Sequence, residues 1–253
     1  MHKPFSFALL MTTLWLFLGA VRAQDTTTET RMIDAKVVRV KLDGLINLKL
    51  MQGAEPSLQI VGDRRYVGKV TAVQTGDTLA LDCEGAGNKS SRGALRAELV
   101  LPQLRELVSE GMGTTEVAGF SGDEIDITLD GTGSMKIAGA YKRMKANLGG
   151  MGSMHMWVSD SENVDIDLRG AGYVTIGGRS KLLRASLGGL GGLNAQQFQA
   201  DSVDIDLSGL GNATVHARTN ANLHLSGLGS VTVYGNPLNR NVSVDGLGKV
   251  SWK

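Results

Sequence analysis

The chain has 253 residues, and its 26 Lys and Arg against 25 Asp and Glu give a net charge of +1. This balance gives no electrostatic reason to expect binding to nucleic acid or to an anionic membrane surface. The single cysteine, Cys83, excludes an internal disulfide, so packing and backbone hydrogen bonds must stabilise the fold. Glycine is abundant, at 34 residues, and aromatic residues make up 5%, which favours closely packed β-structure over a helical bundle.

Residues 1–23 have the pattern of a signal peptide. A positive start at His2-Lys3 precedes an apolar run from Phe5 to Ala20, and Val21-Arg22-Ala23 offers small residues for cleavage. The alternative is an uncleaved membrane anchor, for which the apolar run is too short. We therefore expect an exported protein that begins at Gln24 and has no membrane span in its mature chain.

Residues 24–110 are expected to form an irregular β-region that caps the remainder of the chain. Period-two alternation and β-branched residues predict several short strands here. They cover Val37–Val40, Leu45–Leu50, Leu58–Val61, Val70–Val73, Leu79–Leu81 and Leu95–Leu101. The polar, glycine-rich stretch from Glu84 to Gly93 is expected to be a loop. A cap is needed because an open end of stacked strands exposes unpaired edges.

Residues 111–253 contain a regular Gly-x-Gly repeat. The first glycines of successive pairs are 20, 19, 20, 19, 20, 18 and 19 residues apart. The pairs are Gly111/Gly113, Gly131/Gly133, Gly150/Gly152, Gly170/Gly172, Gly189/Gly191, Gly209/Gly211, Gly227/Gly229 and Gly246/Gly248. Repeats of this length at nearly constant spacing indicate stacked structural units.

Within each repeat, apolar residues alternate on both sides of the glycines, as in Val203, Ile205 and Leu207 before Gly209. This period of two indicates strands. We predict a right-handed parallel β-helix of about 19 residues per coil, with a bend near the glycines and a short polar loop such as Arg218-Thr219-Asn220. The alternative is an antiparallel sheet of hairpins, although the glycines lie within the alternation rather than at hairpin turns.

If the glycines face inward, the residue between each pair faces outward, and these residues form a column that is apolar except for Thr132. Its apolar members are Met112, Met151, Ala171, Leu190, Leu210, Leu228 and Leu247. An exposed apolar row of this length indicates a partner surface, either for another protein or for self-association. The alternative is that twist turns these side chains inward or that loops cover them.

Polar residues before the glycines form two further columns. The first is Asp126, Lys145, Asp165, Arg184, Asp204, Asn222 and Asn241, and the second is Thr128, Asn147, Asp167, Ser186, Asp206, His224 and Ser243. Acid and base alternate over five coils of the first column, which predicts a ladder of surface ion pairs. A second hypothesis is a glycan-active enzyme of the polysaccharide lyase or pectinase kind.

That enzyme would use Asp165, Asp167, Asp204 and Asp206 around Arg184, with calcium held by the carboxylates. Carboxylates two coils apart are about 9–10 Å apart, which is too far to share one ion directly. The ladder explains the same residues without a ligand. We therefore expect no catalytic residues, no metal and no cofactor.

The chain resembles the DUF2807 family of autotransporter-adhesin head (GIN) domains, common in Gram-negative bacteria. The matching features are the glycine-pair coils, Leu101-Pro102-Gln103-Leu104, the opening segment from Leu42 to Gly53, and the ending Gly229-Ser230-Val231-Thr232-Val233-Tyr234-Gly235-Asn236-Pro237. The resemblance implies a parallel β-helix over nearly all of the mature chain. The family usually has serine between the glycines, whereas this chain has mostly Leu or Met.

Together these observations predict a non-enzymatic exported module, adhesin-like, that binds a protein or glycan partner through its long faces. The resemblance places it in the periplasm or at the cell surface of a Gram-negative bacterium. Self-association is expected through the apolar column or through the open C-terminal edge. A purely structural role in the periplasmic envelope is a third possibility for which no residue argues.

Overall fold

The computed structural model describes residues 26–83 and 95–253, most of which lie in β-strands. The strands of the N-terminal part are β1 (Thr26–Arg31), β2 (Arg39–Leu42), β3 (Asn47–Gln52), β4 (Ser57–Asp63), β5 (Val70–Thr75), β6 (Thr78–Cys83), β7 (Arg96–Leu101) and β8 (Glu106–Ser109), with one short helix, α1 (Arg64–Val67). The strands of the repeats are β9 (Thr114–Leu129), β10 (Ser134–Leu148), β11 (Ser153–Leu168), β12 (Tyr173–Leu187), β13 (Gly192–Leu207), β14 (Asn212–Leu225), β15 (Ser230–Tyr234), β16 (Asn239–Val244) and β17 (Lys249–Trp252).

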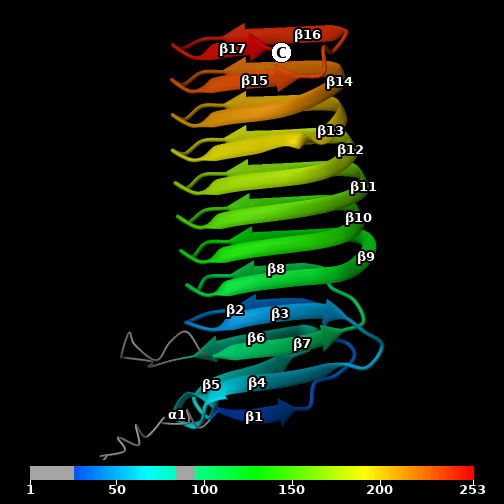
Figure 1. Cartoon of the computed structure of the whole chain (residues 1–253), viewed down its shortest axis with the longest axis vertical. Coiled ribbons are helices and arrows are strands. Elements are labelled where there is room, and N and C mark those ends of the chain that lie inside the picture. The colour runs from blue at the N-terminus through cyan, green and yellow to red at the C-terminus, as the bar shows by residue number, and fades with distance from the viewer. Residues whose placement is uncertain (1–25, 84–94) are drawn as a thin grey trace, which may run out of the picture.

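Strands β9 to β14 stack in parallel, and each one supplies most of a coil of a right-handed β-solenoid (Figure 1). The register follows the repeat, since Val164 pairs with Leu183 and Leu183 pairs with Val203. The predicted parallel β-helix is confirmed. The alternative of antiparallel hairpins is wrong, because neighbouring coils run in the same direction.

The strands break at the glycine pairs and not at the polar segments. β14 runs unbroken through Arg218-Thr219-Asn220, so the prediction of a loop there is wrong. The chain bends within the strand instead, helped by left-handed backbone angles at Asp160 (φ 62°) and Gly178 (φ 116°). We call the side of the solenoid with these bends the bend edge and the opposite side, with the Gly-x-Gly turns, the glycine edge.

The bend divides every long strand between two layers. The first halves of the long strands continue into β15 and β17, and we call this layer the first sheet. The second halves lie between β8 and β16 and form the second sheet. Figure 1 shows these two layers stacked along the whole solenoid, with the bend edge on the right.

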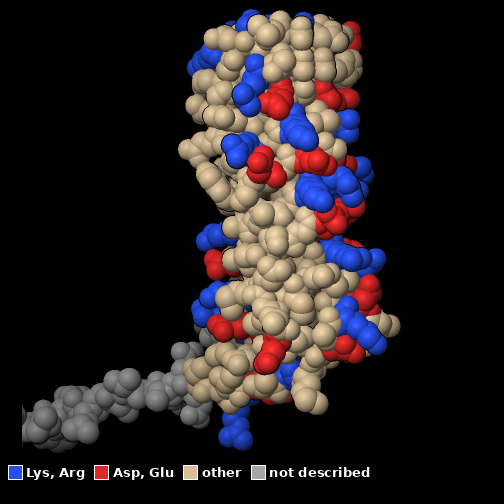
Figure 2. All heavy atoms as spheres, turned by 90° about the vertical axis from the view of Figure 1, so that its right-hand side faces the viewer, with Lys and Arg blue, Asp and Glu red and all other residues tan. Residues whose placement is uncertain are grey.

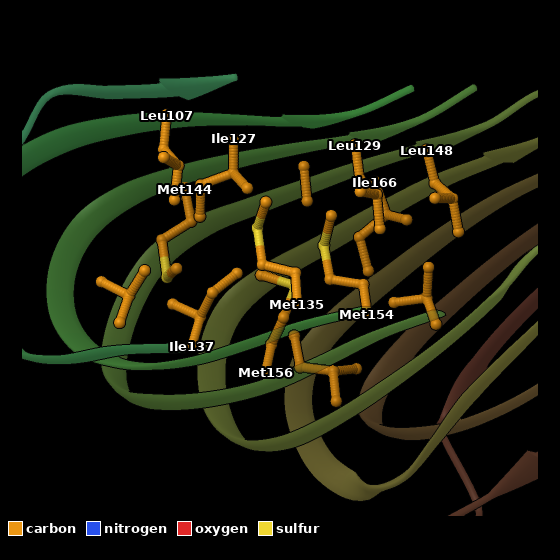
Figure 3. Packing of buried hydrophobic residues seen from close by; sticks show 14 of the residues in the cluster. Leu107, Ile127, Leu129, Met135, Ile137, Met144, Leu148, Met154, Met156 and Ile166 are labelled. Atoms are coloured by element: carbon orange, nitrogen blue, oxygen red, sulfur yellow. The ribbon is translucent and has the colours of Figure 1, made fainter. Parts of the chain in front are cut away.

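The core fills the narrow space between the two sheets. Figure 3 shows Met135, Met154 and Met156 of the first sheet beside Ile127 and Leu129 of the second. All five side chains are at most 4% exposed. Because alternate residues point inward in every coil, the core is a set of continuous aliphatic columns. Burying each such side chain stabilises the fold by about 1.5–3 kcal/mol before entropy is subtracted.

Large aromatic side chains fill the inside of the bend edge. Phe120, Tyr141 and Phe198 are each at most 2% exposed. The hydroxyl of Tyr141 donates a hydrogen bond to the carbonyl oxygen of Leu104 at 2.9 Å, which satisfies its one polar group. Burial raises the pKa of Tyr141 above its ordinary value, so this hydroxyl stays a donor at any physiological pH.

The N-terminal end begins as part of the solenoid and then changes topology. β2 pairs with β8 and β3 with β9 in parallel, so these strands continue the two sheets. β4 pairs antiparallel with both β1 and β7, and β5 pairs antiparallel with β6. The predicted short strands correspond to β2 to β7, whereas β1 and β8 were not predicted. The stretch from Glu84 to Gly93, expected as a loop, lies outside the described residues.

The last coil consists of β16 and β17. Among the described residues, β16 pairs with β14 alone, and β17 pairs with β15 alone. Val242 and Val244, whose equivalents in earlier coils are buried, are 41% and 42% exposed. The C-terminal end of the described solenoid therefore presents strand edges and core-type side chains to solvent.

Candidate functional site

The glycine edge is built by close contact between successive backbones. A Cβ atom on the first glycine of a pair, such as Gly189 or Gly209, would overlap the carbonyl oxygen of the corresponding glycine one coil earlier. The amide of the middle residue donates to that same carbonyl, as in Leu190 to Gly170 at 3.1 Å and Leu210 to Gly189 at 3.1 Å. Glycine is needed here because no side chain fits between the two backbones.

The residues between the glycines are all exposed. We call them the leucine column, although it also contains Met, Ala and Thr. The exposed fractions are 58% for Met112, 70% for Met151, 66% for Leu190, 54% for Leu210, 59% for Leu228 and 84% for Leu247, and Thr132 and Ala171 are exposed as well. Neither inward rotation nor a covering loop hides these side chains among the described residues. Their role as an interface remains a proposal.

The surroundings of the leucine column change along the solenoid. Around Leu190, Leu210 and Leu228 the flanking positions carry only small or uncharged residues. These are Gly188, Ser208 and Ser226 before the glycines and Gly192, Asn212 and Ser230 after them. The three leucines therefore project from an uncharged strip, which suits the desolvated centre of an interface.

The two polar columns lie side by side on the second sheet, in the predicted order. Arg184 lies between two acidic neighbours, with its Nη1 3.9 Å from Asp165 and its Nε 3.6 Å from Asp204. The amide of Asn222 donates to Asp204 at 2.7 Å. With Lys145 also 3.8 Å from Asp126, these contacts form the predicted ladder except between Lys145 and Asp165, which make no ion pair within the described residues. Each exposed pair stabilises the fold by about 0–1 kcal/mol.

One shallow depression of about 690 Å³ on the second sheet is lined by all five residues of the enzyme hypothesis, Asp165, Asp167, Arg184, Asp204 and Asp206. Within it, Asp167 is held away from Arg184 by a two-point ion pair with Arg169, with distances of 2.6 and 3.1 Å. The side chain of Asp206 has no hydrogen bond or ion pair within the described part of the chain. Residues 26–83 and 95–253 contain no group of three His, Cys, Asp or Glu placed to hold a metal ion.

Opposite charges also follow one another along the bend edge. Lys142 contacts Asp123 at 2.7 Å, and its ammonium group lowers the pKa of that carboxyl. Similar pairs join Arg179 to Asp160 and Arg218 to Asp201. Figure 2 faces this edge and shows basic and acidic side chains near one another along the solenoid. The pairs link neighbouring coils, and basic and acidic side chains are mixed along this edge.

Sequence reasoning missed two exposed aromatic residues on the first sheet. Trp157 is 56% exposed and Tyr173 is 49% exposed. Both occupy outward positions of the alternation, a signal that the sequence contained. What the sequence did not show is that a glycine of the next coil lies beside each ring.

The comparisons with known proteins support the fold and identify the family. The chain resembles a crystal structure of a putative adhesin from Parabacteroides distasonis, with a TM-score of 0.80 and 20% identity over 91% of this chain and 98% of that one. A putative adhesin from Parabacteroides merdae gives 0.79 and 18% over 90% and 96%. A putative lipid binding protein from P. distasonis gives 0.78 and 17% over 89% and 96%.

None of the curated proteins matches the sequence significantly. Within the described residues, no helix has the length and apolar character needed to cross a membrane. The model of the DUF2807 family, described as "Putative auto-transporter adhesin, head GIN domain", matches residues 38–237. This match covers most of the chain, and the chain therefore belongs to the DUF2807 family.

Proposed function

We propose that this protein is a non-enzymatic, exported binding module, adhesin-like, that contacts a partner protein through the leucine column. The observation that supports the proposal is the exposure of large apolar side chains at six positions of one edge, each between two glycines. Water contact with this row is unfavourable, so a partner that covers it gains free energy in proportion to the apolar area buried. The family's adhesin description agrees with a binding role.

The first partner to test is a second copy of the same chain. The column repeats with the coil spacing of about 4.8 Å, and another copy has the same spacing along its whole length. Two columns placed in opposite directions can therefore interdigitate over many coils, forming a two-fold symmetric contact. The uncharged strip around Leu190, Leu210 and Leu228 places no like charges against each other in such a contact.

The test replaces Leu190, Leu210, Leu228 and Leu247 together by serine and compares self-association by analytical ultracentrifugation. We expect the variant to stay folded, because these side chains are already 54–84% exposed. We expect its dissociation constant for self-association to rise at least ten-fold. The matched control replaces three exposed apolar residues outside the column, Met32, Val73 and Leu238, by serine. It should associate like the wild type.

Either of two results would count against this use of the column. One is a wild-type protein that stays monomeric at high concentration. The other is a column variant that associates as strongly as the control. Unfolding of the column variant, seen by circular dichroism, would show that the leucines stabilise the fold in a way that their exposure does not indicate.

We further propose that the protein is exported to the periplasm or the cell surface, on the strength of the signal-peptide pattern in residues 1–23. Protease treatment of intact cells, followed by immunoblotting with a lysed control, separates the two compartments. Digestion in intact cells places the protein outside. Protection until lysis places it in the periplasm and directs the search for partners to the cell envelope.

A further inference from the structure

The outer face of the first sheet differs in chemistry from the outer face of the second sheet. In five successive coils, the strand segments of this face contain no Asp, Glu, Lys or Arg. The segments are residues 153–158, 173–178, 192–197, 212–217 and 230–234. The second sheet, in contrast, carries the charged ladder around Arg184. We call the uncharged surface the aromatic face, because Trp157 and Tyr173 are exposed on it.

Each of these two rings lies against a glycine of the next coil. A Cβ atom on Gly177 would be 2.6 Å from Cζ3 of Trp157, and one on Gly192 would be 2.6 Å from Cε2 of Tyr173. The ring thus occupies the space that a side chain of the neighbouring strand would fill. About half of each aromatic side chain stays exposed, at 56% and 49%. Each ring therefore packs against the backbone of the neighbouring strand and is open to solvent on its remaining surface.

The spacing of the two rings suits an extended ligand. Trp157 on β11 is paired with Gly177 on β12, and Tyr173 lies four residues before Gly177 on that strand. The positions of the two rings are therefore separated by about 13 Å along the strands and by one strand spacing of about 4.8 Å across them. Between the two rings lie three polar residues that pair across β11, β12 and β13, namely His155, Thr175 and Asn194. An elongated molecule that covers one ring can therefore reach the other.

The polar side chains between the rings have unused hydrogen-bonding groups. The Oδ1 atom of Asn194 accepts a bond from the amide of Gln196 at 3.2 Å, which leaves its NH₂ group free to donate. His155 and Thr175 have no side-chain hydrogen bond within the part of the chain that the structure describes. A depression of about 380 Å³ lies beside Trp157 and is lined by Gln197, Gln199 and the Asp160–Arg179 ion pair, among others.

We propose that the aromatic face binds a neutral oligosaccharide. A sugar ring presents an apolar C–H surface that can cover an aromatic ring, and hydroxyl groups at its rim that match amide, hydroxyl and imidazole partners. A single-stranded nucleic acid would also stack on aromatic rings, but it requires a cationic groove that this face lacks. Because each ring already packs against a glycine of the next coil, binding costs less side-chain conformational entropy.

This inference rests on the proposed function only in that both make the protein a binding module. It uses an adjoining surface, since the leucine column lies on the glycine edge and the aromatic face begins at residues that flank it, such as Gly192. The leucine-column variant changes no residue of the aromatic face. The two can therefore fail independently, and the leucine-column variant is included in the experiment for that reason.

The experiment screens the full mature chain against immobilised hexasaccharides of β-1,4-glucose, β-1,4-N-acetylglucosamine, β-1,4-xylose and α-1,4-glucose, with a polyuronide as the charged comparison. Affinity for the best neutral probe is then measured by tryptophan fluorescence in a Trp252→Phe background. In that variant Trp157 is the one tryptophan in residues 24–253 and therefore the source of the signal. Isothermal calorimetry provides the affinity of variants that lack Trp157.

We expect Trp157→Ala and Tyr173→Ala each to weaken binding by about ten-fold or more, and Trp157→Phe to retain part of the affinity. Gly177→Ala is the most specific variant, because the added Cβ atom displaces the Trp157 ring although the chain keeps a tryptophan at that position. It should weaken binding without lowering the melting temperature. The leucine-column variant should bind the oligosaccharide like the wild type.

Three results would overturn the inference. They are the absence of binding to every neutral probe at millimolar concentration, binding that only the polyuronide shows, and binding that Trp157→Ala and Gly177→Ala leave unchanged. Loss of self-association in the leucine-column variant alongside any of these would leave the proposed function standing. Oligosaccharide binding by a protein that does not self-associate would support the aromatic face and count against the leucine column as a self-association surface.

Discussion

Two adjacent glycines, Gly188 and Gly189, show how closely single residues determine this fold. A Cβ atom on Gly189 would overlap the carbonyl oxygen of Gly170 and lie 2.6 Å from that of Arg169, whereas a Cβ on Gly188 would meet only Ser208, at 3.7 Å. Backbone atoms of a neighbouring coil cannot move aside without disturbing the stack. The same amino acid is therefore required at one position and replaceable at the next.

We predict that Gly189→Ala lowers the free energy of unfolding by about 2 kcal/mol or more, because it forces two coils apart. Gly188→Ala, its matched control, should stay within about 0.5 kcal/mol of the wild type. Urea denaturation followed by circular dichroism measures both. Similar midpoints for the two variants would show that the glycine edge tolerates a side chain and that its spacing has another cause.

Among the secondary-structure elements, the short helix α1 depends on one carboxylate. The side chain of Asp63, which is 9% exposed, accepts a hydrogen bond from the backbone amide of Arg65 at 2.9 Å and pairs with its guanidinium group at 2.6 Å. The hydrogen bonds from Arg65 lower the pKa of Asp63 from 3.8 to about 2. The carboxylate is thus more stable in the folded chain than in the unfolded one.

A lowered pKa gives a definite pH dependence. The stabilisation by Asp63 is complete above its unfolded pKa of 3.8 and is lost as the pH falls toward 2. Asp63→Asn keeps an acceptor for the helix cap and removes the charge. We expect the wild type to melt at a higher temperature than this variant at pH 7, and the difference to disappear between about pH 4 and pH 2. A difference that stays constant over this range would contradict the assignment.

For the whole molecule, stability depends on how many neighbours each coil has. In a solenoid each coil contacts only the coils above and below it, so terminal coils have half of the contacts of internal ones. β12 lies between β11 and β13, whereas β16 and β17 each pair on one side only. The half-exposed Val242 and Val244 show the missing neighbour directly.

Hydrogen exchange followed by mass spectrometry should therefore give a gradient along the solenoid. We predict that amides of β16 and β17 exchange much faster than those of β12 in dilute protein, because opening the end coil breaks one interface instead of two. If the end coil is protected as strongly as β12, something covers it. Repeating the measurement at higher concentration would then show whether that cover is another copy of the chain.

Much of the architecture followed from the sequence because its two signals are local. Period-two alternation specifies which residues face the core, and the nearly constant spacing of glycine pairs specifies which residues stack. Given both, the order of the charged column through Asp165, Arg184 and Asp204 could be predicted before any distance was known. The outward direction of the leucine column followed from the same alternation.

Contacts between distant residues decided the rest. The strand breaks at the glycines because backbones of successive coils meet there. It continues through residue 219, where the register to β13 shifts and the pairing resumes at Asn220. The exposure of Leu190 depended on no loop returning over it, and the seat of Trp157 depended on Gly177 lying one coil away. The sequence by itself determined the repeat, the parity and the parallel stack. The tertiary structure decided which outward side chains remain open to a partner, because that depends on contacts between residues of neighbouring coils.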